Sequence, residues 1–297
     1  MTATTSVLFD APGPKARRNI LISNLVALAA VLVVVVLVLM QLDRQGQLAP
    51  QQWVNALNAN AWTNYYLPGL QFTLQASGIA VVTALVFGLV FGFLRLAPFA
   101  IVRAVSGVIV EFFRAVPVLV MMFFLYFFFA RVAAPAGLMA GTDAAYYGVI
   151  VGLTLYNGAV IAELVRSGVK SLPKGQREAA AAVGMTNNQS LRLVEVPQAL
   201  TAMLPSLLSQ FVVILKDSAL GYLIGFYELL QYSRQLGSGY SNILQTLVVA
   251  ALIFIVINFI LTWLATKLAG NLSSRTSGEA APTTSTTVAP TVGVEPK

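Results

Sequence analysis

The sequence predicts an all-α integral membrane protein with about six membrane-spanning helices. Of its 297 residues, 58% are hydrophobic and only 10% are charged, and the mean hydropathy is +0.79. A soluble domain carries roughly a quarter charged residues, so the composition places this chain in a bilayer. The apolar residues fall into separate runs of about 20 residues or more, the length that an α-helix needs to cross the hydrocarbon core.

The composition also excludes several classes of function. The sequence has no Cys and no His, which excludes disulfides, thiolate chemistry and His-centred metal or acid–base sites. We therefore expect no metal site and no enzyme active site. The excess of 18 Lys and Arg over 11 Asp and Glu would suit nucleic-acid binding, but its distribution fits membrane topology better. Nucleic acid is not an expected partner.

The first 64 residues predict a cytoplasmic tail, one span and a segment on the outer face. Residues 1–19 are polar, and basic residues precede an apolar run at 20–40. Signal peptides share this pattern, but the run is long enough to span and no small-residue cleavage site follows it. Residues 42–64 are polar and carry Trp and Tyr, which is typical of an interfacial helix, with a plain loop as the alternative.

Five further spans are predicted in a transmembrane domain at 65–269. They cover about residues 67–96, 102–130, 146–165, 200–220 and 243–268. Gly88 and Gly92, four residues apart in the second span, favour close helix packing. The connection at 221–242 either dips back into the bilayer or lies along its surface. Residues 270–297 are rich in Ser, Thr, Pro and Ala, which predicts a disordered cytoplasmic tail.

Six spans put both termini on one side, and the basic residues identify that side as the cytoplasm. The basic residues expected on this side are Lys15, Arg17, Arg18, Arg95, Arg103, Arg166, Lys170, Lys174, Arg177, Arg192, Lys267 and Arg275. Only Arg44, Arg131 and Arg234 are expected on the other side. By the positive-inside rule, both termini and the loop between the fourth and fifth spans are cytoplasmic.

This central loop, residues 174–197, is the longest polar stretch between two spans. Residues 176–183 are rich in strong helix formers and predict a short helix. Gly184 then predicts a helix stop, and Thr186 or Asn187 predicts the cap of a second helix that ends before the closing proline. Two helices of this size are too short to fold alone, so the loop needs a partner surface.

Ionisable and polar residues within the spans are candidates for a substrate pathway, because each ionisable group costs about 2.5–3.5 kcal/mol to insert. The candidates are Glu111, Arg114 and Pro117 in the third span, Asn157 and Glu163 in the fourth, and Lys216, Asp217 and Ser218 at the end of the fifth. Glu111 can pair with Arg114, and Glu163 with Arg166, because each pair is three residues apart. Pro117 is expected to kink its helix. The alternative is that these groups are ion pairs that only make the spans insertable, or that lie at the membrane surface.

Four of these motifs resemble, in order, those of ABC-importer permeases of the polar amino acid uptake family. Glu178-Ala179-Ala180, Gly184 and Val196-Pro197-Gln198 resemble the EAA loop, the coupling helix that docks on a cytoplasmic ATPase in that family. The segments EFFRAVP at 111–117, NGAVIAELVR at 157–166 and LKDSAL at 215–220 resemble three further family motifs. The sequence departs from these motifs at Ala115, Val116, Met121, Val160, Ser218 and Ala219. The resemblance covers about residues 66–269.

The resemblance implies a permease subunit that works by alternating access and binds no nucleotide itself; no G-x-x-x-x-G-K-[ST] motif occurs. It implies ATPase coupling through Gly175, Glu178, Ala179, Ala180, Gly184 and Pro197. The implied partners are two ATPase subunits that bind the ATP, an extracytoplasmic substrate-binding protein and a second permease, with a heterodimer favoured over a homodimer.

The expected substrate is a polar amino acid. Arg114 and Lys216 favour an acidic one such as glutamate, and glutamine or a basic amino acid stays open. The main alternative function is a secondary transporter or channel driven by an ion gradient, and a weaker one is a membrane scaffold without transport.

Overall fold

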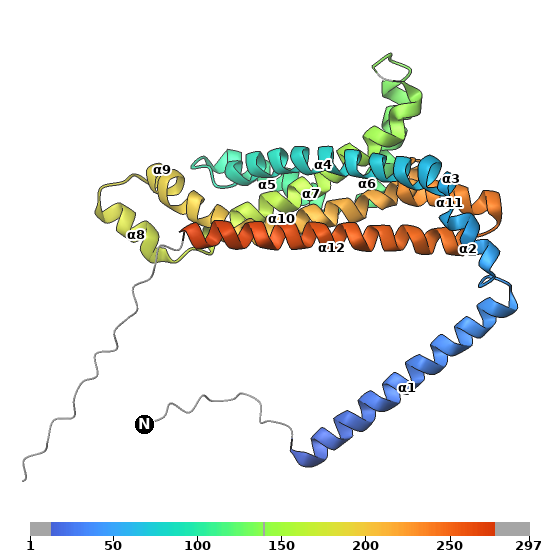
Figure 1. The fold of residues 1–297 in the computed structure, drawn as a ribbon. Coiled ribbons are helices and arrows are strands. Elements are labelled where there is room, and N and C mark those ends of the chain that lie inside the picture. Colours follow the sequence, from blue (N-terminus) through green and yellow to red (C-terminus); the bar gives the residue numbers. More distant parts are fainter. Residues whose placement is uncertain (1–12, 139, 277–297) are drawn as a thin grey trace, which may run out of the picture.

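The computed structural model describes residues 13–138 and 140–276, and this part of the chain folds into helices joined by short turns (Figure 1). The helices are α1 (Pro14–Arg44), α2 (Pro50–Leu57), α3 (Ala59–Ala61), η1 (Trp62–Tyr66), α4 (Leu67–Leu94), α5 (Ala100–Ala115), α6 (Val118–Phe128), η2 (Phe129–Ala133), η3 (Gly141–Asp143), α7 (Ala144–Lys170), α8 (Lys174–Ala182), α9 (Asn187–Ser190), η4 (Leu191–Glu195), α10 (Val196–Ser218), η5 (Ala219–Ile224), α11 (Leu229–Tyr240) and α12 (Ile243–Thr276).

These helices supply up to six membrane crossings, which agrees with the hydropathy pattern. Five stretches are long and apolar enough to span, namely α1, Ala59–Leu94, α7, Asn187–Ile224 and Ile243–Lys267. The sixth crossing consists of α5 and α6–η2, which meet at an angle of 99°. The third span is therefore not one helix over 102–130. Val116 is extended, and Pro117, which has no N–H to donate, precedes α6, so the expected kink is a complete break.

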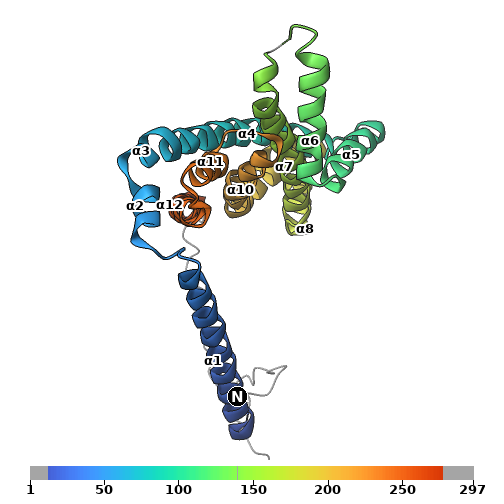
Figure 2. The same ribbon diagram turned by 90° about the vertical axis from the view of Figure 1, so that its right-hand side faces the viewer.

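The centre of the bundle is built on α4 and α7, which pack side by side (Figure 2). Gly88 and Gly92 lie directly against Ile161 and Val165 of α7, where a Cβ atom on either glycine would overlap the facing side chain. The predicted close packing at this glycine pair is confirmed. Buried side chains from α4, α6, α7 and α10 then form one core between these helices.

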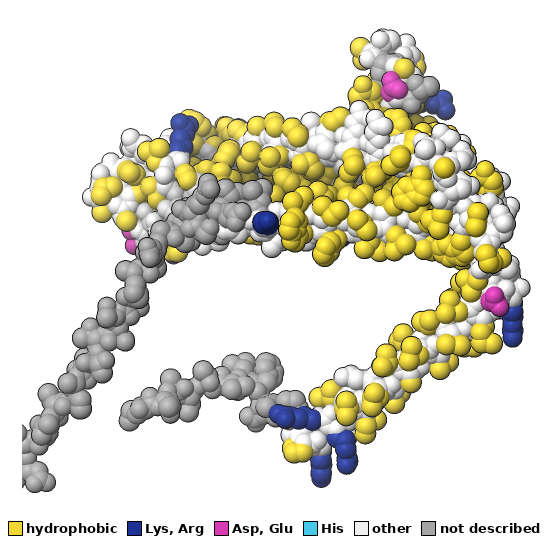
Figure 3. Space-filling model, viewed as in Figure 1, with side chains coloured by type: hydrophobic (Ala, Val, Ile, Leu, Met, Phe, Trp, Pro, Cys, Tyr) yellow, Lys and Arg dark blue, Asp and Glu magenta, His cyan; other side chains and the backbone are white. Residues whose placement is uncertain are grey.

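The first span, α1, lies apart from this bundle. It begins at Pro14 and ends at Arg44, so residues 14–19 of the predicted tail are helical. None of its residues is buried, and its apolar side chains are exposed on the face seen in Figure 3, with basic side chains at the end far from the bundle. Such a surface suits lipid. Residues 1–12 of the predicted tail lie outside the described residues.

Two segments that the sequence left without a definite structure, residues 42–64 and 221–242, both contain helices. Residues 50–57 and 59–61 are helical, so the plain-loop alternative for 42–64 is wrong. The 221–242 connection folds back as η5 and α11, and α11 packs against α4 and α12. The backbone N–H of Leu229, at the start of α11, donates to Thr73 Oγ1 at 3.0 Å. This connection is therefore part of the packed bundle.

The last helix is longer than expected. α12 continues through Thr276, so the predicted disordered tail does not begin at Gly270. The remainder of that tail, residues 277–297, lies outside the described residues.

Candidate functional site

The central loop forms a helical elbow, residues 174–195, which projects from the end of the bundle where α4 ends and α10 begins (Figure 1). The chain turns after α8 at Gly184, whose φ of +81° lies in the left-handed region that favours glycine. Thr186 caps α9, because its hydroxyl accepts from the Gln189 N–H and the Gln189 side chain accepts from the Thr186 N–H. The predicted stop and cap are confirmed, with Thr186 as the cap.

One prediction for the elbow is wrong, because its second helix does not end before Pro197. α9 continues through the π-helical turn η4 into α10, and the Val196 N–H donates to the carbonyl of Leu191, five residues back. Pro197 then lies in the first turn of α10. A proline is tolerated there because the wider turn rearranges the local hydrogen bonds and the missing N–H falls at a helix start.

The elbow presents most of its residues to the surroundings. Gly175, Glu178 and Ala179 are exposed, whereas Ala180 is buried against the rest of the loop. Two apolar side chains, Val183 and Leu193, are 74% and 67% exposed. Because the loop lies beyond the apolar spans, these side chains would face water in the isolated subunit. Exposed apolar residues beside polar ones are typical of a protein-binding surface.

An ion pair joins the two arms of the elbow. Arg177 of α8 donates to Glu195 of η4 through Nε at 3.2 Å and Nη2 at 2.5 Å. The Glu195 side chain is only 4% exposed, and it also accepts from the Ser190 hydroxyl at 3.0 Å. The hydrogen bond between them raises the pKa of the Arg177 guanidinium and lowers the pKa of the Glu195 carboxyl, so each charge favours the other. This pair attaches α8 to the segment that leads directly into α10.

Two of the candidate carboxylates, Glu111 and Glu163, belong to one ion network near the same end of the bundle. Arg95, just after α4, donates to Glu163 of α7 at 2.8 Å and to Glu111 of α5 at 3.1 Å. Arg114 bonds Glu111 at 3.0 Å, and Arg166 bonds Glu163 at 2.5 Å. The two predicted pairs at i,i+3 are therefore present, and Arg95 connects them into one network that joins three helices.

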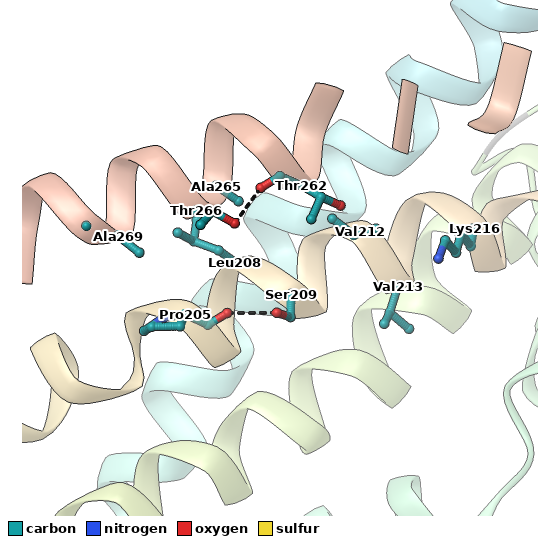
Figure 4. Close-up of a pocket in the computed structure, with 11 residues that line it drawn as sticks. Pro205, Leu208, Ser209, Val212, Val213, Lys216, Thr262, Ala265, Thr266 and Ala269 are labelled. Atoms are coloured by element: carbon teal, nitrogen blue, oxygen red, sulfur yellow. Dashed lines mark hydrogen bonds between the residues drawn. The ribbon is translucent and has the colours of Figure 1, made fainter. Parts of the chain in front are cut away.

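A groove between α10 and α12 contains Lys216 (Figure 4). It encloses about 550 Å³ and is lined by Pro205, Leu208, Ser209, Val212, Val213, Lys216, Thr262, Ala265, Thr266, Ala269 and Gly270. The Ser209 and Thr266 hydroxyls donate to carbonyls of their own helices, which leaves their oxygen lone pairs available. Lys216 lies at one end of the groove, forms no ion pair with any described residue, and no carboxylate belongs to the lining. The groove thus suits an anionic or zwitterionic solute.

The other candidate pathway residues lie away from this groove. Asn157 is fully buried, and it links α7 to α10 by accepting from Gln210 at 2.5 Å. Ser218 is buried and donates to the Leu215 carbonyl. Asp217 is partly buried, and Pro117 marks the break between α5 and α6. The structure therefore does not bring the eight candidate residues together at one site.

The sequence did not predict a site role for four residues whose side chains connect these helices, namely Arg95, Arg177, Glu195 and Gln210. Each bonds a partner on another helix, from 16 to 68 residues away in the chain. No helical spacing rule connects such positions. The available signal was weaker: Glu195 is an acidic residue within a mainly apolar stretch, and a residue of that kind needs a cation close by.

A helical bundle that crosses the membrane several times and carries a structured elbow at one end is the architecture of a multi-pass membrane permease. A family model described as "binding-protein-dependent transport system inner membrane component" matches residues 84–273. That range covers more than half of the chain, and the chain belongs to this family. Permeases of this family work with an ATPase and a substrate-binding protein in a membrane complex.

Individual relatives agree with this assignment. The chain is 46% identical over 227 residues to the glutamate transport system permease protein GluD of Corynebacterium glutamicum, covering 76% of this chain and 82% of that protein. It is 32% identical to the probable glutamine ABC transporter permease protein GlnP of Bacillus subtilis, covering 67% and 90%. The crystal structure of an amino acid ABC transporter with histidines aligns at a TM-score of 0.62 with 27% identity, covering 72% and 95%.

Proposed function

We propose that this chain is the permease subunit of an ATP-driven importer of acidic amino acids, and that the elbow transmits the motion of a cytoplasmic ATPase. The observation that carries the proposal is the exposed elbow, with Val183 and Leu193 open to a partner. It is joined to α10 through the Arg177–Glu195 pair and the continuous η4 turn. A movement of α8 can therefore be transmitted to the membrane helix α10 without an intervening flexible loop.

The coupling proposal is tested by substitutions on the elbow. Glu178→Arg reverses an exposed charge, and Gly184→Val places a β-branched residue at a φ of +81°, which costs about 1–3 kcal/mol. Both variants should insert normally, abolish substrate uptake and leave ATP hydrolysis uncoupled from transport in the reconstituted complex. Wild-type uptake in both variants would rule out a coupling role for the elbow.

The substrate proposal rests on charge. Lys216 is the charged residue among those that line the α10–α12 groove, and in a low-dielectric surrounding it attracts a carboxylate strongly. The relative named for glutamate transport supports the same choice, and the relative named for glutamine transport supports a polar amino acid more broadly. Competition of labelled glutamate uptake by a panel of amino acids tests it. Aspartate should compete strongly, and stronger competition by lysine or arginine would exclude an acidic substrate.

Orientation and assembly complete the proposal. Both termini and the elbow face the cytoplasm, because most basic residues outside the spans lie on that side. A second, related permease subunit would cover the open side of the α10–α12 groove, and we favour a heterodimer. Labelling of single-cysteine variants in intact cells tests the orientation, and copurification of bound subunits tests the assembly. Uptake that depends on an ion gradient and not on ATP would instead support a secondary transporter.

A further inference from the structure

A polar face of α11 lines a second cavity, on the opposite end of the bundle from the elbow. Leu229, Ser233, Leu236 and Gly237 form the buried face of this helix. The opposite face contributes Gln231, Arg234, Gln235 and Ser238, which together with Tyr222, Leu223 and Tyr227 line an open cavity of about 530 Å³. The cavity shares none of its lining residues with the α10–α12 groove.

α11 lies in the outer part of the membrane domain, and Arg234, Gln235 and Ser238 on its polar face are exposed. At its inner end, the Leu229 N–H donates to Thr73 in the second turn of α4. Just beyond its outer end, Asn242 donates to the Gln52 carbonyl at 2.9 Å, in the segment that precedes the spans. Between these points the helix rises about 18 Å. A polar helix face at this depth is stable only against protein or against a water-filled space.

Arg234 is the charged residue among those that line this cavity, which is therefore positively charged. Arg234 lies over the ring of Tyr222, with 5.0 Å between its Cζ and the ring centroid, and it forms no ion pair with a described residue. No Asp or Glu lines the cavity. Stacking fixes the plane of the guanidinium and leaves the N–H donors at its edge free for a carboxylate. The side chains of Gln231 and Gln235 place amide oxygens nearby that can accept from an ammonium group.

We propose that this cavity is an outer binding site for the acidic amino acid, in which Arg234 holds a carboxylate and the two glutamine amides receive the α-ammonium group. The proposal rests on the proposed import function. It adds the place where the permease first binds the substrate after the substrate-binding protein has released it on the outer side. Arg234 distinguishes glutamate from glutamine here by holding the side-chain carboxylate, because it forms an ion pair with that group in glutamate and only a hydrogen bond to the neutral amide in glutamine.

The test measures equilibrium binding of radiolabelled glutamate and glutamine to the purified complex in nanodiscs of zwitterionic lipid, without the substrate-binding protein. Arg234→Gln should weaken glutamate binding by about tenfold or more and glutamine binding by less than about threefold. Arg234→Lys should lie between the two, and Tyr222→Leu should weaken glutamate binding because the guanidinium loses its support. Arg131→Gln, which removes an exposed arginine of η2 outside the cavity, is the matched control and should bind as wild type.

Glutamate binding within twofold of wild type in folded Arg234→Gln and Tyr222→Leu proteins would overturn the inference. So would the absence of glutamate binding to the wild-type complex at millimolar concentrations. If Arg234 instead holds a lipid phosphate, its substitution lowers retention of anionic lipid in mixed nanodiscs and leaves glutamate binding unchanged, which also overturns it. Failure of the proposed function looks different, because the wild-type complex would then show no ATP-dependent uptake of any acidic amino acid.

Discussion

Replacing Arg177 by methionine removes the cation that is bonded to the Glu195 carboxylate, while the aliphatic part of the side chain is largely kept. Glu195 stays almost fully buried and retains the hydrogen bond from Ser190. Breaking a fully buried ion pair costs about 3–5 kcal/mol, because one charge is left without a partner. The Arg177 side chain is 62% exposed, so solvent screening reduces this value, and we expect about 1–3 kcal/mol.

This loss falls on the elbow and not on the whole bundle, because both residues belong to its two arms. A change of about 1.4 kcal/mol shifts an opening equilibrium tenfold. In Arg177→Met, α8 should therefore separate from η4 far more often, and its amide hydrogens should exchange about tenfold faster or more. In the assembled transporter, more ATP should be hydrolysed per substrate imported, because the ATPase then moves an arm that is no longer joined to α10.

Two comparisons make the result decisive. Arg192→Met removes an exposed arginine of the same elbow that has no ion pair among the described residues, and it should leave exchange and coupling unchanged. In the double variant Arg177→Met with Glu195→Met, no buried charge remains unpaired, so α8 should be more stable than in Arg177→Met alone. Unchanged amide exchange in α8 together with an unchanged ATP-to-substrate ratio in Arg177→Met would refute the assignment of the pair as a mechanical link.

Two further predictions concern the ends of the bundle. Glu163→Gln removes the charge that Arg95 and Arg166 share, and it should lower the unfolding free energy by about 1–3 kcal/mol; a thermal melting temperature equal to wild type would contradict this network. Burial raises the pKa of the Glu228 carboxyl to about 7, despite the N–H groups it accepts from at the start of α11. Between the usual carboxyl pKa of 4.5 and about 7, the folded state binds a proton that the unfolded state does not. Stability should therefore fall as the pH rises through this window, and Glu228→Gln should flatten the slope in melting curves recorded at a series of pH values.

Local patterns predicted local structure well. The spans followed from uninterrupted apolar runs, and the stop at Gly184 and the cap at Thr186 followed from residues whose preferences act within a few positions. The pairs at i,i+3 around Glu111 and Glu163 were predictable for the same reason. Each of these features depends on helical geometry alone.

Features that depend on distant segments were not predictable. Arg95 joins two pairs that are themselves far apart in the sequence, and nothing in its neighbourhood indicates that role. The π-helical turn at η4 inserts one extra residue into a helical turn, so Pro197 no longer ends a helix. α11 is only moderately apolar, and its place in the bundle depends on a surface supplied by α4 and α12.

α1 contributes no buried residue to the described bundle. Just beyond its outer end, the Gln47 carbonyl accepts from Gln245 and the Gln52 carbonyl accepts from Asn242, which attaches the following segment to the start of α12. A chain that started after this helix would keep every buried side chain of the described core, since α1 supplies none. Exchange of the apolar side chains of α1 for other apolar ones should therefore leave the packing of the described core unchanged.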